Sequence, residues 1–533
     1  MYSGLSPSHH QPQQPNDMTE TAKDAFAAIA EAAGPHALIT DPAELRYYSQ
    51  DVFSTGPTVL AVFRPSDKEM LARGIAAATS AGVAIVPRGG GMSYTGGYLA
   101  PTAFALLIDT AAMNRILEIN EEDMTVTVEA GCSWEQLQSA LKPKGLRTLA
   151  WGTLSGIKAT VGGGMSQNGV FWGASGGTIA DAAISFEVVL ADGAIVATGS
   201  DFFRPFGPDI TGLFAADCGA LGVKATITLQ LVREGAAFAY GSFAFADAPA
   251  YFGAMSAIAR EGLASESFGF DPYLQAQRMK RDSLGKDAKS LVNMMKAQGS
   301  AWKALKEGAK VVAAGRSFLD DVPFSLHVIC EGRHQAAVDA DLQAIEKIAQ
   351  QFAGRSIENT IPKILRANPF PPVNSMVGPQ GERWVPVHGF LPHSRLVEGW
   401  QRIQALFAAH SEQMTAEGVS AGAMLAAVSR STCLIEPVFF WPDALEEIHC
   451  RSLEPDHLAK LNRFSVNERS RALVGKLRAD IVGIFRELEA THLQVARTYP
   501  LQAASDPRAW EILQAVKRTV DPSNLMNPGS LGL

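Results

Sequence analysis

The chain has 533 residues, more than a single hydrophobic core usually supports, so we expect two domains. Hydrophobic residues make up 47% of the chain and charged residues 19%, a balance that permits both a large core and a polar surface. The formal net charge is -8 and no block of like charges occurs, which argues against a nucleic-acid partner and against a basic membrane-surface helix.

Residues 1–18 are polar and proline-rich, so we expect a disordered tail in which His9 and His10 are exposed to solvent. The tail lacks the apolar run of a secretory signal, and no stretch has the roughly 18 apolar residues of a membrane span. The cysteines form no C-x-x-C pair and lie in apolar segments, which predicts buried thiols in a reducing cytoplasm. They are Cys132, Cys218, Cys330, Cys433 and Cys450.

The next two hundred residues mix predicted strands and helices. An alanine-rich helix is expected at residues 19–33, and a strand at 59–63 precedes a capping box, SDKE, that opens a helix ending near Ser80. A further helix begins after Ser133. Short strands are expected at residues 83–86, 104–108 and 125–129, and a hairpin around the Asp-Gly pair at 192–193. This mixture indicates an α/β or α+β domain.

The pattern changes near residue 236. Strands are predicted at residues 238–245, 325–330 and 434–441, and a lysine-bearing helix at 274–313. We therefore place a second domain at residues 236–453. The remaining segment, 454–533, contains predicted helices at 465–490 and 506–519 and ends in the turn-rich sequence DPSNLMNPGSLGL.

Two glycine-rich segments stand out in the first domain: RGGGMS at residues 88–93 and TVGGGMSQNG at 160–169. Three successive glycines destabilise a fold unless the backbone needs a positive φ or a close approach to another group. Successive N–H groups in such loops can surround an anion, and a pyrophosphate is a suitable guest. Neither segment contains G-x-G-x-x-G or the P-loop pattern, so a Rossmann site and an NTPase are both disfavoured.

Four motifs occur in the order found in the FAD-linked oxidases typified by vanillyl-alcohol oxidase, p-cresol methylhydroxylase and the D-lactate and glycolate dehydrogenases. They are RPSDKEM…VPRGGGMSYTGG, TVGGGMSQNG, FGPDITGLFAADCGALGVKATITLQL and the final DPSNLMNPGSLGL. The chain resembles this superfamily most strongly over residues 37–232 and again over 491–533. The resemblance implies an α+β fold: a two-subdomain flavin-binding domain of the p-cresol methylhydroxylase type at 19–235, an α+β cap over the substrate at 236–453, and a return to the flavin domain at 454–533.

The resemblance also implies FAD as cofactor. Carried over by motif, the residues lining it are Pro87, Arg88, Gly89, Gly90, Gly91, Met92, Ser93, Thr160, Gly163, Gly164, Gln167, Asn168, Gly169, Gly222 and Val223. Relatives that tether the flavin covalently have a histidine where this chain has Met92, or a cysteine where it has Lys158-Ala159. We therefore expect non-covalent FAD, although His388 and His393 in the cap leave a tether from that domain open.

Arg497, in HLQVARTYP, resembles the arginine of the Y-R-T-H segment of vanillyl-alcohol oxidase. A fixed cation there would bind the cofactor and stabilise the charge that reduced flavin carries near N1. The alternative is an arginine in a surface ion pair. The tyrosine that precedes it in that enzyme is Ala496 here, which weakens a phenol-oxidase assignment unless Tyr499 takes over its role.

Three further residues are candidates for the chemistry. His388 and His492 could accept the substrate's hydroxyl proton, because an unperturbed histidine titrates near pH 6.5, or each could be structural. Glu436 lies in an apolar, aromatic strand, so it is either paired or faces a cavity. The segment WVPVHGFLPHSR lacks the G-D-G-N motif of metal-binding hydroxy-acid dehydrogenases, and we expect no metal.

These features predict an oxidoreductase that takes a hydride from the CH–OH group of a small organic substrate onto flavin N5. An aryl or benzylic, phenolic alcohol fits the missing metal motif and the Arg497 segment. A D-2-hydroxy acid such as D-lactate or glycolate fits the GPDITGLF…GALGV motif. A non-catalytic flavin-binding or electron-transfer protein is the third alternative. Oxygen, a quinone or a cytochrome could reoxidise the flavin, and a homodimer is not excluded.

Overall fold

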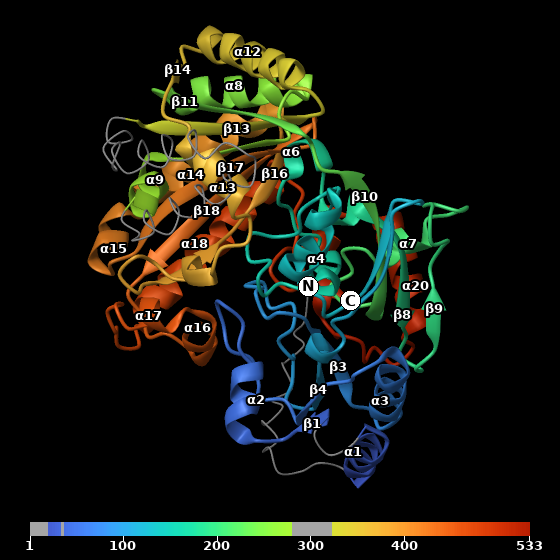
Figure 1. Ribbon diagram of the computed structural model, residues 1–533. Helices are drawn as coiled ribbons and strands as arrows, with labels where there is room; N and C mark the ends of the chain where they lie inside the picture. Colours follow the sequence, from blue (N-terminus) through green and yellow to red (C-terminus); the bar gives the residue numbers. More distant parts are fainter. Residues whose placement is uncertain (1–19, 34–36, 280–321) are drawn as a thin grey trace.

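The computed structural model describes residues 20–33, 37–279 and 322–533. The expected tail with His9 and His10, and the expected helix at 274–313 beyond residue 279, lie outside these ranges. The described chain forms three β-sheets with helices around them. Two of the sheets lie in the lower and right part of the molecule, and the third lies in the upper left part (Figure 1). No helix among the described residues is long and apolar enough to cross a membrane.

The first sheet has the strand order β1-β2-β4-β3, in which β2, β4 and β3 run parallel. Its strands are β1 (Leu38–Ile39), β2 (Ala61–Phe63), β3 (Ala84–Arg88) and β4 (Ala105–Asp109). Apolar side chains of α1 (Glu20–Ala33) and α3 (Lys68–Ser80) pack on one face. Helix α3 begins near the predicted place, but its N-cap is Asp67, which accepts from the Met70 amide at 2.7 Å, and not Ser66 of the expected capping box. Strand β3 ends where the first glycine segment begins, which fixes that segment at an edge of the sheet.

The second sheet is antiparallel, with the order β5-β6-β10-β8-β9 and with β7 paired to β10. Its strands are β5 (Ile116–Asn120), β6 (Thr125–Glu129), β7 (Leu146–Thr148), β8 (Ala183–Val189), β9 (Ile195–Ala197) and β10 (Val223–Arg233). The predicted hairpin is confirmed, because β8 pairs with β9 and Gly193 in its turn has a φ of 82°. Apolar side chains of α4 (Trp134–Leu141) and α20 (Pro507–Val520) pack against this layer.

The cap sheet has the order β14-β11-β13-β12-β17-β18-β15, with β16 paired to β18. Its strands are β11 (Ala237–Phe245), β12 (Glu266–Phe270), β13 (Phe324–Gly332), β14 (Arg355–Ser356), β15 (Arg383–Pro386), β16 (Gly389–Pro392), β17 (Ser420–Val428) and β18 (Thr432–Trp441). Four long helices cover its outer face: α8 (Ala248–Glu261), α12 (Gln335–Gln351), α14 (Leu396–Ala409) and α18 (Glu468–Glu487). Helix α18 therefore packs on the cap, although the expected boundary near residue 453 lies before it.

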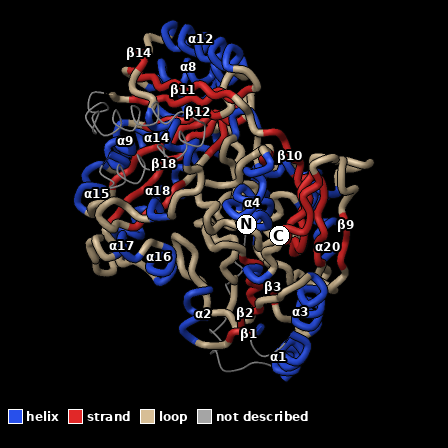
Figure 2. The backbone as a smooth tube through the Cα atoms, viewed as in Figure 1, coloured by secondary structure: helices blue, strands red, loops and turns tan. Residues whose placement is uncertain are grey.

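Shorter helices link these layers. They are α2 (Pro42–Tyr48), α5 (Val161–Gln167), α6 (Gly173–Gly176), α7 (Ile210–Phe214), α9 (Pro272–Met279), α13 (Thr360–Ala367), α15 (Ser411–Ala416), α16 (Glu447–Ser452), α17 (Pro455–Leu458) and α19 (Leu501–Ala504). Figure 2 shows that helices gather on the outside of the cap sheet, whereas loops fill most of the region between the cap and the other two sheets.

Strand β18 shows how the cap sheet is oriented. Successive side chains of a strand point to opposite faces. Cys433, Ile435, Phe439 and Trp441 belong to the core beneath the outer helices. The intervening Leu434, Glu436, Val438 and Phe440 line a cavity on the inner face. The alternation therefore directs Glu436 into that cavity.

Candidate active site

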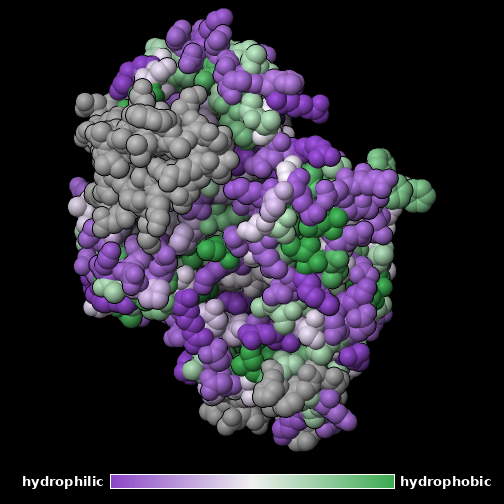
Figure 3. Space-filling model, viewed as in Figure 1, coloured by the Kyte–Doolittle hydropathy of each residue, from purple (hydrophilic) through white to green (hydrophobic). Residues whose placement is uncertain are grey.

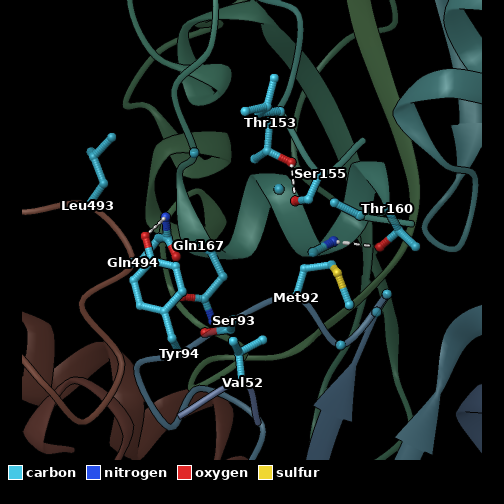
Figure 4. A pocket seen from close by; sticks show the side chains of 18 of the residues that line it. Val52, Met92, Ser93, Tyr94, Thr153, Ser155, Thr160, Gln167, Leu493 and Gln494 are labelled. Atoms are coloured by element: carbon cyan, nitrogen blue, oxygen red, sulfur yellow. Dashed lines mark hydrogen bonds between the residues drawn. The ribbon is translucent and has the colours of Figure 1, made fainter. Parts of the chain in front are cut away.

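A cavity of about 300 Å³ lies between the cap sheet and the other two sheets. We call its two sides the cofactor wall, which includes residues 87–94 and 159–170, and the cap wall, which includes inner-face side chains of β15 to β18. Figure 4 shows Met92, Ser93, Thr160 and Gln167 of the first side, and Leu493 and Gln494, which approach from the C-terminal part of the chain.

The first glycine segment presents unpaired backbone amides to the cavity. Residues 89–94 all line it, and their N–H groups donate to no acceptor in the part of the chain that the structure describes. Six successive amides without partners are costly unless a ligand accepts from them. Such a run of N–H groups suits a polyanion.

The two glycine segments touch each other at backbone distance. A Cβ atom added to Gly90 would lie 1.9 Å from the carbonyl oxygen of Lys158, and one added to Gly89 would lie 2.4 Å from Thr160 Oγ1. Glycine is needed at both positions because a side chain would push the segments apart. The second segment is not the loop expected: Thr160 accepts from the Gly163 amide at 3.1 Å and begins helix α5, which contains all three glycines.

Two buried cations line the cofactor wall. Arg88 lies among the rings of Tyr47, Tyr48 and Tyr98, with its guanidinium carbon 4.7 Å from the Tyr48 ring centroid. Its Nε has no partner among the described residues. Lys224 is buried and donates to Asp217 at 2.6 Å and to Ser166 at 2.9 Å. Unpaired amides and an incompletely bonded arginine fit the diphosphate of a dinucleotide cofactor.

The cap wall is mainly apolar. It consists of Leu274, Phe390, Met424, Leu434, Val438 and Phe440, with the single carboxylate Glu436. Tyr94 and Trp384, in edge-to-face contact at 5.8 Å, border it. Burial raises the pKa of Tyr94 well above its ordinary value, and nearby Glu436 adds to this, so the hydroxyl stays protonated. A pocket of this kind suits an apolar ligand with one or two polar groups.

His388, His492 and Tyr499 form one buried cluster beside the cap wall. His388 lines the cavity, and burial lowers its pKa to about 3, so the ring is neutral. Its Nδ1 lies 3.2 Å from the Tyr499 hydroxyl, and its Nε2 accepts from the Leu493 amide at 3.2 Å. The ring of His492 stacks on Tyr499 at 4.1 Å, and its Nδ1 lies 2.7 Å from the His388 carbonyl oxygen. Both rings therefore hold the backbone of this region together.

The two cap histidines proposed as tethers are both engaged by the protein. Each ring nitrogen of His388 has a protein partner, as described above. His393 does not line the cavity, and its Nε2 bonds the Arg430 carbonyl oxygen at 2.9 Å. No group of three or more His, Cys, Asp and Glu side chains placed to hold a metal ion occurs within residues 20–33, 37–279 and 322–533.

Arg497 does not line the cavity. Its guanidinium donates to the Gly96 carbonyl at 2.6 Å and to Asn527 and the Pro528 carbonyl at 2.8 Å, and burial lowers its pKa. Asn527, fully buried, donates in turn to the carbonyls of Gly97 and Cys218. The arginine thus fastens the final turn of the chain to Gly96, just beyond the first glycine segment, and it forms no ion pair with any described residue.

The other predicted site residues fall into two groups, those that line the cavity and those that do not. Nearly all of the predicted cofactor residues line the cavity: Pro87, Arg88, Gly89, Gly90, Gly91, Met92, Ser93, Thr160, Gly163, Gly164, Gln167, Gly169, Gly222 and Val223. Asn168 does not; its φ is 50°, and its side chain accepts from the Ala180 amide, so it ends helix α5. Among the catalytic candidates, His388 and Glu436 line the cavity, whereas His492 and Tyr499 lie behind it.

Sequence reasoning missed Tyr94, Lys224 and Gln494. Tyr94 directly follows the first glycine segment and Lys224 directly follows Val223, so their positions were available from the motifs. Gln494 donates to the Tyr94 hydroxyl at 3.3 Å (Figure 4). Nothing near it in the sequence marks it, because its place depends on the chain returning to the cavity after α18.

The fold and the cavity are those of a protein that binds a dinucleotide cofactor beneath a substrate cap. Comparison with known proteins specifies the class: residues 59–199 match the FAD binding domain family, and residues 495–531 match the C-terminal domain of FAD linked oxidases. These two matches support the FAD-linked oxidase superfamily as the class of this chain, with FAD as the cofactor.

One curated relative is the glycolate oxidase subunit GlcD of Bacillus subtilis (strain 168), 33% identical over 217 residues, which are 40% of this chain and 45% of that protein. Another is the alkyldihydroxyacetonephosphate synthase of Caenorhabditis elegans, 25% identical over 304 residues, 54% of this chain and 47% of the synthase. The matches thus span about half the length of these relatives. The structure of p-cresol methylhydroxylase with substrate bound covers 97% of this chain and 98% of its own, with a TM-score of 0.69 and 16% identity. The predicted α+β fold of that type is confirmed.

Proposed function

We propose that this FAD-dependent oxidoreductase acts on the CH–OH group of a small aryl or benzylic alcohol. The observation that carries the proposal is the cap wall, in which apolar side chains of β16 to β18 surround one carboxylate, Glu436. Flat aromatic substrates gain most from such a wall, because the burial of apolar surface stabilises their binding. The phenolic subclass belongs to the same proposal.

The distribution of cations supports an uncharged substrate over a D-2-hydroxy acid. Within the described residues, Arg88 and Lys224 are the Lys and Arg side chains that line the cavity, and both belong to the cofactor wall. Lys224 is already paired with Asp217. A substrate carboxylate buried against the cap wall would lack a partner, which is costly. The D-2-hydroxy-acid dehydrogenase is kept as the second candidate because of the similarity to the glycolate oxidase subunit.

Glu436 of the cap wall, Tyr94 of the cofactor wall and His388 beside the cap wall would divide the work as follows. Glu436 accepts the proton of the substrate hydroxyl while the neighbouring carbon loses its hydride, so that the alcohol becomes a carbonyl compound. Tyr94, protonated and oriented by Gln494, donates a hydrogen bond to the substrate oxygen. His388 is a positioning residue, because its neutral ring already bonds Tyr499 and the Leu493 backbone. Bound FAD supplies the hydride acceptor.

Anaerobic reduction of the bound flavin tests the proposal. The FAD-loaded protein is mixed without oxygen with vanillyl alcohol, benzyl alcohol, D-lactate or glycolate, each with and without a chelator. We expect the aryl alcohols to bleach the blue absorbance of the flavin, the two acids to leave it unchanged, and the chelator to have no effect. Bleaching by D-lactate alone would favour the second candidate. If neither class reduces the flavin, a non-catalytic flavin-binding or electron-transfer protein is favoured instead. Reoxidation by oxygen, a quinone or a cytochrome then identifies the acceptor.

A further inference from the structure

The segment at residues 200–208, between β9 and α7, exposes three aromatic side chains; we call it the phenylalanine loop. The exposed fractions are 71% for Phe202, 62% for Phe203 and 89% for Phe206. Ile210, at the start of α7, is 42% exposed. Figure 3 shows a hydrophobic projection at the right edge of the molecule, where Figure 1 draws the chain between β9 and α7. Isolated exposed apolar side chains are ordinary, but adjacent ones at a projecting tip mark an interaction site.

Hydrogen bonds hold this loop in one shape. Ser200 Oγ donates to the Phe203 carbonyl at 2.8 Å and accepts from the Phe203 amide at 3.2 Å. Arg204 donates to both carboxylate oxygens of Asp209, at 2.8 to 3.2 Å, and to the carbonyls of Ala180 and Ala183. The rings are thus presented to solvent by a fixed backbone, with nothing in the described chain packed over them.

The loop is remote from the catalytic chemistry. None of its residues lines the cavity. It extends from β9, the outermost strand of the second sheet, on the side of the molecule that faces away from the cap (Figure 1). A role for the three phenylalanines in holding FAD or substrate is therefore not supported, and their function has to be sought outside the chain.

We propose that the phenylalanine loop inserts into the interface of an uncharged lipid bilayer and attaches the enzyme to a membrane surface. The exposed apolar area of the loop favours a lipid surface over a protein partner. Three rings exposed to this degree offer roughly 400 Å². A stable protein interface buries about 800 Å² per partner, which is twice as much. Insertion of three rings suffices for reversible membrane attachment, because each ring that is buried in the lipid adds to the free energy of binding.

Charge specifies the kind of lipid. Arg204 is neutralised by Asp209, which leaves Asp201 as the remaining charge of the loop. The whole chain carries a formal net charge of -8. Anionic lipids would repel such a protein, and no basic residue of the loop is free to attract them. Attachment is therefore apolar, best on phosphatidylcholine, and insensitive to salt.

Vesicle flotation of the FAD-loaded protein tests this proposal. We expect the wild-type protein to float with phosphatidylcholine vesicles, equally at low and high salt, and less with vesicles rich in phosphatidylglycerol. The triple variant Phe202→Ser, Phe203→Ser, Phe206→Ser should lose partitioning by roughly tenfold per ring. Ile512→Ser is the matched control, since Ile512 is 66% exposed on α20 outside the loop, and it should float like the wild type.

Two results would overturn the proposal. One is equal flotation of the triple variant and the wild type, or no flotation of either. The other is a wild-type dimer in sedimentation that the triple variant converts to a monomer, which would assign the loop to contact with a second copy. Flavin content and anaerobic flavin reduction of the triple variant should match the wild type, so that this test and that of the proposed function fail independently.

Discussion

The cofactor wall and the cap wall meet in one cavity but are built from different parts of the chain. The cofactor wall presents backbone amides at residues 89–94 and is shaped by glycines that touch neighbouring backbone. The cap wall presents side chains of a sheet, among them Phe390, Glu436 and Phe440. A backbone wall allows few substitutions and serves one cofactor, whereas a side-chain wall can change its residues while the sheet remains. The two walls should therefore respond differently to substitution.

The strongest test of this contrast is Gly90→Ala. The new Cβ would lie 1.9 Å from the Lys158 carbonyl oxygen, so the two glycine segments must separate. We expect the variant to lose FAD, with affinity reduced at least a hundredfold, because the unpaired amides that would hold the diphosphate are displaced. The ratio of flavin to protein absorbance after purification measures this. Circular dichroism should show that the cap remains folded; a variant that retains full flavin content would contradict the description of this wall.

On the cap wall, Glu436→Gln should separate binding from chemistry. The amide keeps the size of the side chain but cannot accept the hydroxyl proton, so we expect flavin reduction by the alcohol to slow by about a thousandfold. Flavin content should match the wild type, since Glu436 belongs to the other wall. Stopped-flow reduction under anaerobic conditions gives the rate. An unchanged rate would remove Glu436 from the reaction.

The contact between the cap sheet and helix α6 contains a buried carboxyl group, Glu266, whose ionisation makes the stability of the fold depend on pH. Glu266 on β12 is buried, its Oε2 has no partner among the described residues, and burial raises its pKa to about 8 although amides of Gly173 and Ser267 donate to it. A carboxyl group with a raised folded pKa stabilises the fold fully below its unfolded pKa near 4.5, and this contribution is lost as the pH rises to 8.

Glu266→Gln removes this dependence. We expect the variant to be more stable than the wild type by roughly 4–5 kcal/mol at pH 9 and similar to it at pH 4.5. Urea titrations at the two pH values give the free energies of unfolding. Equal stability differences at both pH values would mean that the carboxyl group does not titrate across this range.

The smallest expected effect is that of replacing Gly475, a glycine that belongs to neither wall of the cavity. An added Cβ at Gly475, inside α18, meets nothing within 4 Å. Gly475→Ala should therefore keep its FAD and raise the free energy of unfolding by about 0.5–1 kcal/mol, because alanine favours the helix. The same absorbance ratio and a urea titration check it. Loss of flavin here would show that Gly90→Ala reports on general folding and not on contact between the segments.

The contrast between the walls also decides what could be predicted from the sequence. The cofactor wall follows from motifs whose residues are close in sequence, and all the predicted cofactor residues except Asn168 and Arg497 line the cavity. Glu436 could be placed on the inner face once its strand was recognised, since alternate residues share a face. The α+β fold followed from the same motifs.

The residues that could not be placed depend on contacts between distant segments. Arg497 was expected beside the flavin, but its guanidinium bonds Asn527 and Gly96, which only the closing turn brings near it. Helix α18 was assigned to the segment that follows the cap, yet its apolar face packs with the outer helices of the cap sheet. The local hydrophobic pattern predicts that such a helix forms, but it does not identify the layer against which the helix packs.

The final turn has a consequence for biosynthesis. Ile85 pairs with Met526, and Asn527 bonds Gly97 and Cys218, so this turn joins segments that lie far apart in the sequence. Because translation proceeds from the N-terminus, the nascent polypeptide can fold its first sheet early but cannot join β3 to the closing turn until residue 527 has been made.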